Sequence, residues 1–189
     1  MLNMIQSCFL FAAVGATLKF IDQAYDENLY SKTTALLVSP LCGFFAGYLG
    51  SLDPNFFVLL LAVTIGCIVS RKIDNPAFFI ASVIFIFTLI LRTQEIEFQM
   101  SHLIILGILS VCAYIDEVEN DQADRCQRKR PREIFFRYKG LMKLTVVITW
   151  ILEYLRLEHV ICFFLFDSAY LFVDLWSTRR CQNLESAEH

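Results

Sequence analysis

The sequence predicts an all-α integral membrane protein, a helical bundle of about seven transmembrane helices. Hydrophobic residues make up 57% of the 189 residues, and the mean hydropathy is +0.55. They occur in long blocks that are apolar on every side, which indicates contact with lipid, because a helix on a soluble core is apolar along one stripe only. The same continuous blocks disfavour a membrane β-barrel, whose strands alternate apolar and polar residues.

The first half of the chain contains four apolar segments, residues 4–20, 33–51, 55–70 and 76–91. The first segment lacks the basic start and the cleavage site of a signal peptide, so we expect a retained helix. Gly43 and Gly47 in the second form a GxxxG pattern, which lets helices approach closely. We expect this pattern to pack inside the bundle and do not favour an oligomer contact through it. Prolines 54 and 76 can begin the third and fourth helices.

The second half adds residues 101–115, 141–155 and 159–176. Polar residues around position 156 separate the last two segments, which are either two spans or one bent or re-entrant unit. The chain would cross the membrane six times in the second case. All segments are expected to form one transmembrane domain over residues 1–189. Most are shorter than the roughly 20 residues that span a bilayer, so flanking residues must extend them.

Lysine and arginine residues predict the orientation. With seven spans, fourteen of the sixteen basic residues fall on one side of the membrane, and only Arg92 and Arg156 fall on the other. Because short cytoplasmic loops are enriched in basic residues, we expect the N-terminus outside and the C-terminus in the cytoplasm. The expected location is the plasma membrane.

Aspartates follow the first, third, fifth and seventh segments, all on the predicted cytoplasmic side. They are Asp22, Asp74, Asp116 and Asp174. A negative charge is unfavourable at a helix C-terminus, so four such residues point to a role beyond solvation. Asp22 and Asp26 are spaced i, i+4 and share a helical face, which suits part of a Mg²⁺ site. The simpler interpretation is that each aspartate is a solvated charge.

Residues 116–140 are expected to form a cytoplasmic loop that is acidic first and basic afterwards. If the acidic part is helical, Glu117, Asp121 and Asp124 share one face. The basic part could anchor the topology or bind anionic lipid headgroups. Carboxylates holding Mg²⁺ beside basic residues form a pairing suited to lipid phosphates.

One short motif resembles a known family. Residues 120–124 read Asn-Asp-Gln-Ala-Asp, which is similar to the first five positions of the N-D-x-x-D-x-x-x-D motif of membrane prenyltransferases. Arg128 stands where the last aspartate of that motif is expected. The resemblance implies prenyl diphosphate and Mg²⁺ chemistry without implying membership of the family.

Asp167 lies inside an apolar run, Ile161 to Trp176. An ionisable group at that depth is costly and is therefore a functional candidate, or else a protonated carboxyl bonded to a neighbouring helix. Asp174 is seven residues further along the same helical face, and the two could form a polar path from the cytoplasm.

The sequence is therefore compatible with three functions. The first is a Mg²⁺-dependent transferase or hydrolase acting on a phosphorylated lipid or prenyl substrate at the cytoplasmic face. Its expected partners are membrane lipids, with no nucleic acid. The second is a cation or proton transporter using Asp167, and the third is a non-catalytic scaffold. For the enzyme, the candidate catalytic residues are Asp116, Asp121 and Asp167. The candidate phosphate-binding residues are Arg71, Lys72, Arg125 and Arg128, and the candidate metal ligands are Asp22, Asp26, Asp74, Asp116, Glu117 and Asp174.

Overall fold

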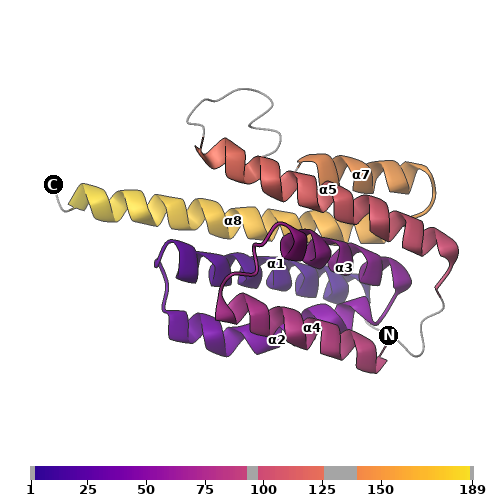
Figure 1. The fold of residues 1–189 in the computed structure, drawn as a ribbon, viewed down its shortest axis with the longest axis horizontal. Coiled ribbons are helices and arrows are strands. Elements are labelled where there is room, and N and C mark those ends of the chain that lie inside the picture. Colours follow the sequence, from indigo (N-terminus) through magenta and orange to yellow (C-terminus); the bar gives the residue numbers. More distant parts are fainter. Residues whose placement is uncertain (1–2, 93–97, 126–139, 188–189) are drawn as a thin grey trace. The chain divides into compact units, whose positions relative to one another are not determined.

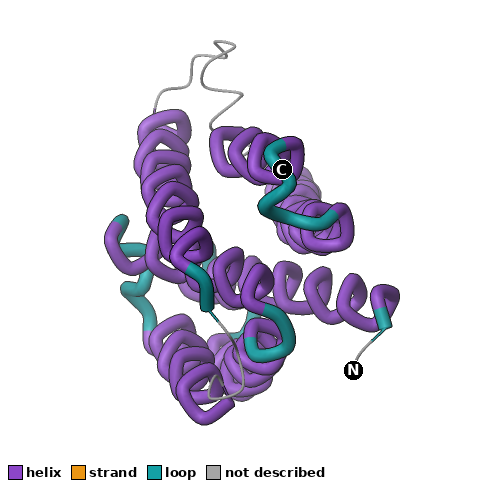
Figure 2. Tube along the Cα trace, turned by 90° about the vertical axis from the view of Figure 1, so that its right-hand side faces the viewer, coloured by secondary structure: helices purple, strands orange, loops and turns teal. Residues whose placement is uncertain are grey.

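A computed structural model describes residues 3–92, 98–125 and 140–187. All regular structure in these residues is helical, which confirms the all-α prediction (Figures 1 and 2). The seven described helices are α1 (Met4–Asp26), α2 (Lys32–Gly50), α3 (Pro54–Val69), α4 (Pro76–Arg92), α5 (Met100–Arg125), α7 (Gly140–Ile151) and α8 (Leu157–Ala187).

Four of the described helices are long and apolar enough to cross a membrane. These are α1, α2, the Met100–Asn120 part of α5 and the Leu157–Ser177 part of α8. The other three are apolar but shorter, with 16 residues in α3, 17 in α4 and 12 in α7. At about 1.5 Å per residue, α7 reaches only about 18 Å of a hydrocarbon layer roughly 30 Å thick.

Several helices continue beyond their apolar segments. The acidic part of the predicted loop is helical, because α5 runs on to Arg125. Residues 113–125 contain no glycine or proline, so nothing in the backbone stops the helix where the hydrophobicity stops. The loop prediction was therefore wrong for this part, and residues 126–139 lie outside the described residues. In the same way α1 extends to Asp26 and α8 to Ala187.

The segment around position 156 separates two helices, α7 and α8. The chain turns at residues 152–156, where Glu153 has a φ of 63°. The N–H groups of Tyr154 and Leu155 both donate to the Thr149 carbonyl, at 3.0 and 3.3 Å, so the end of α7 is capped. Within the described chain α7 and α8 are thus two helices rather than one bent helix.

The chain divides into two compact units. The first comprises Met1–Tyr48, Asp74–Leu91 and Cys162–His189, and the second comprises Leu49–Ile73 and Arg92–Ile161.

Small residues pack the helices of the first unit against each other in parallel pairs. A Cβ on Gly15 of α1 would lie 2.1 Å from the Phe166 carbonyl oxygen of α8. Nearer the N-terminal end of the same two helices, the sulfurs of Cys8 and Cys162 are 3.4 Å apart, so α1 and α8 run in the same direction. Gly43 of α2 approaches α4 as closely, with its Cβ position 2.2 Å from the oxygen of Ala81. Backbones that close require glycine.

The second unit combines a parallel and an antiparallel pair. Gly66 of α3 faces Ala113 of α5, where an added Cβ would lie 2.6 Å from the alanine methyl group. The ring centres of Phe57, near the N-terminal end of α3, and Phe98, two residues before α5 begins, lie 4.7 Å apart, so α3 and α5 are parallel. The helix α7, sixth in the described chain, runs antiparallel to α5 (Figure 1). Within each unit, these directions are those expected for helices that alternate up and down.

Candidate functional site

A half-buried charge cluster lies between α1 and α8 in the first unit. The Lys19 ammonium is 2.9 Å from Asp22 Oδ2 and 3.0 Å from Asp174 Oδ1. It also lies over the ring of Tyr170, 5.3 Å from the ring centre, which favours a cation. The Lys19 side chain is only 13% exposed. One cation therefore holds two of the predicted metal ligands together.

One carboxylate of this cluster, Asp174, belongs to a polar stripe along α8. Asp167, Tyr170, Asp174 and Ser177 are spaced three, four and three residues apart, so they share one face of the helix. Asp167 is 6% exposed and Ser177 is fully buried. The Ser177 hydroxyl donates its hydrogen to the Val173 carbonyl at 2.9 Å. The Tyr30 hydroxyl, 2.8 Å from the Ser177 oxygen, therefore donates to that oxygen.

Gln23 extends the cluster on the α1 side. Its side-chain amide donates to Asp174 Oδ1 at 3.2 Å, and the residue is 1% exposed. Its Oε1 atom is buried without a hydrogen-bond partner among the described residues. An unpaired buried acceptor is costly, and here it lies on a residue that contacts the charged groups.

Asp116 has a different role, as a cap for another helix. Its two oxygens accept hydrogen bonds from the backbone N–H groups of Leu141 at 3.1 Å and Met142 at 2.7 Å. Leu141 and Met142 lie in the first turn of α7, where the helix dipole and the unpaired N–H groups favour a negative charge. The idea that Asp116 and Asp174 sit at unfavourable helix C-termini was therefore wrong, because both helices continue past them.

A second polar contact, between Asp53 and the buried His159 in the second unit, was not predicted from the sequence. The Arg156 N–H donates to His159 Nδ1 at 3.2 Å, so the other ring nitrogen, Nε2, carries the proton and donates to Asp53 Oδ1 at 3.0 Å. Asp53 also accepts from the Asn55 N–H at 2.8 Å and caps α3. Burial would raise the pKa of Asp53, but the hydrogen bonds from His159 and Asn55 hold this pKa below its ordinary value.

The remaining predicted site residues are dispersed. Asp26 and Asp74 are exposed, and Asp74 lies in the connection before α4. Arg71 is exposed with a left-handed φ of 61°, and Lys72 is half-buried. Glu117 is buried beside Asp116 in the sequence of α5.

Three predicted residues are described only in part or not at all. Asp121 and Arg125 lie in α5, whose described side chains end before them, and Arg128 lies outside the described residues. Among the described residues no three His, Cys, Asp or Glu side chains gather closely enough to hold a metal ion.

Some signals for this site were visible in the sequence. Lys19 and Asp22 are spaced i, i+3, which places them together on one helical face. Nothing local connects Lys19 with Asp174, because the helix pairing that joins them spans most of the chain. Comparison with protein-family models, curated proteins and solved structures found no match.

Proposed function

We propose that this chain is an integral membrane protein that crosses the membrane seven times, with its N-terminus outside and its C-terminus in the cytoplasm. Four helices long and apolar enough to cross a membrane support the multi-pass class. The alternating helix directions within each unit and the one-sided distribution of basic residues support seven spans.

Cysteine labelling tests this topology. In a background without the native cysteines, Glu27→Cys lies between α1 and α2, and Arg156→Cys lies between α7 and α8, both at exposed positions. A membrane-impermeant maleimide added to intact cells is expected to label position 156 and to label position 27 only after permeabilisation. Labelling of both positions from the same side would refute the proposal.

Within this frame, buried Asp167 and the half-buried charges beyond it support transfer of a cation, most simply a proton, along the contact between α1 and α8. The main observation behind this proposal is the burial of Asp167, which is 6% exposed and lies inside a helix long and apolar enough to cross a membrane. Burying an ionisable group at that depth costs free energy, so such groups are rare and are usually retained for a function. It shares a helical face with Asp174, which contacts Lys19, so acidic and basic groups follow one another along the helix.

Proton flux into liposomes tests this function. The purified protein is reconstituted with a pH-sensitive dye inside, and a potassium diffusion potential drives proton entry. Asp167→Asn removes the titratable group with little change in size and is expected to abolish the flux, whereas the matched Asp26→Asn, at an exposed position of α1, is expected to retain it. Wild-type flux equal to that of protein-free liposomes, or equal flux through Asp167→Asn, would contradict the proposal.

The Mg²⁺-dependent lipid enzyme stays a separate prediction. A metal ion at Asp22 or Asp174 would have to displace Lys19, and one at Asp116 would have to displace the N–H groups of α7. Turnover of a prenyl diphosphate in proteoliposomes that requires Mg²⁺ would support it. The scaffold hypothesis predicts that neutral substitutions at these acids change membrane insertion without changing any activity.

A further inference from the structure

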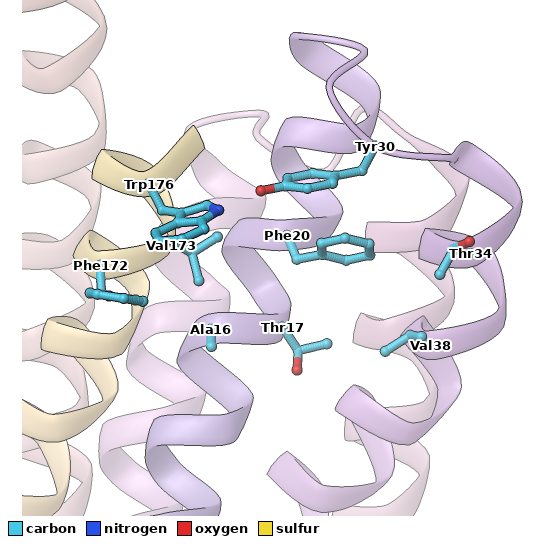
Figure 3. Close-up of a pocket in the computed structure, with 9 residues that line it drawn as sticks. All are labelled: Ala16, Thr17, Phe20, Tyr30, Thr34, Val38, Phe172, Val173 and Trp176. Carbon is cyan, nitrogen blue, oxygen red and sulfur yellow. The ribbon is translucent and has the colours of Figure 1, made fainter. Parts of the chain in front are cut away.

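An apolar pocket of about 580 Å³ lies in the first unit, between α1, α8 and the region that begins α2 (Figure 3). Phe20 and Ala16 line it from α1, and Phe172 and Trp176 line it from α8. Tyr30, just before α2, covers one end, and its ring lies 4.6 Å from that of Phe20. The volume is within the range of about 300–1,000 Å³ that is typical of ligand sites.

The pocket wall carries no charged residue, and two of its three hydroxyl groups, those of Thr17 and Tyr30, already have partners. Thr17 donates to the Ala13 carbonyl at 2.7 Å, and the Tyr30 hydroxyl is bonded to Ser177. A ligand therefore meets hydrocarbon and aromatic rings along most of the wall. Such a surface selects an apolar chain, because a polar ligand would lose its hydrogen bonds to water without replacement.

The position of the pocket indicates where such a chain comes from. All three helices around it are long and apolar enough to cross a membrane, so the pocket opens toward hydrocarbon rather than water. Phe172 and Trp176, at 65% and 61% exposed, form a wall that stands open on this face. Tyrosine and tryptophan concentrate at the membrane interface, so Tyr30 and Trp176 place one end of the pocket at headgroup level.

We propose that this pocket holds the hydrocarbon chain of one membrane lipid. The polar end of the lipid lies beside Tyr30 and Trp176, and the chain runs inward along α1 past Ala16. This site shares α1 and α8 with the charge cluster but does not depend on cation transfer, because none of its lining residues is charged.

Native mass spectrometry of the full chain released from phosphatidylcholine nanodiscs provides the first test. The wild-type protein is expected to retain one lipid per chain. Val38→Phe fills the pocket and is expected to lower the fraction of lipid-bound protein about tenfold. Val83→Phe, on the exposed surface of α4 and away from the pocket, is the matched control and is expected to retain the lipid. Equal retention by both variants, or no lipid on the wild type, would overturn the proposal.

Fluorescence quenching keeps the test valid if a variant folds poorly. The chain has two tryptophans, so Trp150→Phe leaves Trp176 as the single reporter at the pocket, and Trp176→Phe leaves Trp150 on α7. In liposomes with a small fraction of phosphatidylcholine brominated along its chains, a bound lipid quenches Trp176 more than its mole fraction predicts. Quenching of both reporters in simple proportion to the mole fraction would indicate surrounding lipid only and would refute a site.

Discussion

Replacing Asp116 with asparagine tests whether this carboxylate fastens α5 to the beginning of α7. The wild-type side chain is 1% exposed and accepts hydrogen bonds from the N–H groups of Leu141 and Met142. Asparagine keeps one oxygen and turns its amide group toward the other N–H, so one donor is left unpaired. A buried hydrogen bond to a charged group is worth about 1.5–3 kcal/mol, and the loss of the charge at the helix terminus adds to it. We expect a loss of about 3 kcal/mol in the free energy of unfolding.

The assay uses a tryptophan within the helix that Asp116 caps. Trp150 lies in α7, so in a Trp176→Phe background its emission during unfolding in mixed micelles reports the loss of α7 packing. Asp74→Asn is the control, because Asp74 also follows an isoleucine but is exposed. Its effect is expected to stay within about 0.5 kcal/mol, as for most surface substitutions. Equal stabilities of the two variants would refute the capping role, and so would an unchanged Trp150 transition in Asp116→Asn.

Three further predictions follow from the packing and charges. Gly15→Ala is expected to cost about 1–3 kcal/mol because its methyl group meets a backbone carbonyl, whereas Gly107→Ala, with open space around it, is expected to be neutral or slightly stabilising in the same unfolding assay. Lys19→Met is expected to cost about 1–3 kcal/mol because it leaves two half-buried carboxylates without their shared cation, and a melting temperature equal to that of the wild type would contradict this. The folded-state pKa of Asp53 is below the ordinary value of 3.8, so the stability that its carboxylate contributes is present above that pH and declines as the pH falls below it. The difference in melting temperature between the wild type and Asp53→Asn is therefore expected to shrink between pH 4 and pH 2. A difference that stays constant over this range would contradict the prediction.

The fold class and the positions of the helices could be predicted from hydrophobicity, whereas several helix ends could not. Hydropathy marks where a chain leaves an apolar surrounding, and helix propensity marks where the backbone stops being helical. The two coincide at Val69, where α3 ends just before a polar connection, and they differ at Asp116, where α5 continues to Arg125. The interpretation of Asp116 as the end of a helix failed for that reason.

The site was predictable in its components but not in its pairings. Their positions at the ends of or inside apolar segments pointed to Asp22, Asp167 and Asp174. The structure places all three in the first unit, on α1 and α8. The cation between two of them is Lys19, one of the fourteen basic residues whose distribution predicted the orientation. A contact between helices at opposite ends of the described chain leaves no periodic pattern in one sequence.

The parallel packing of α1 and α8 has a consequence for biosynthesis. Lys19 is made early, with Asp22 as its local partner, but its second partner, Asp174, follows 155 residues later. At about 5–20 residues per second, α1 waits about 8–30 s before α8 can cover its polar face. During that interval a membrane insertase, a chaperone or the lipid interface must accommodate Lys19 and Gln23. Chains that stop before α8 therefore expose a charged helix face in the membrane, a feature by which quality control can recognise an unfinished copy.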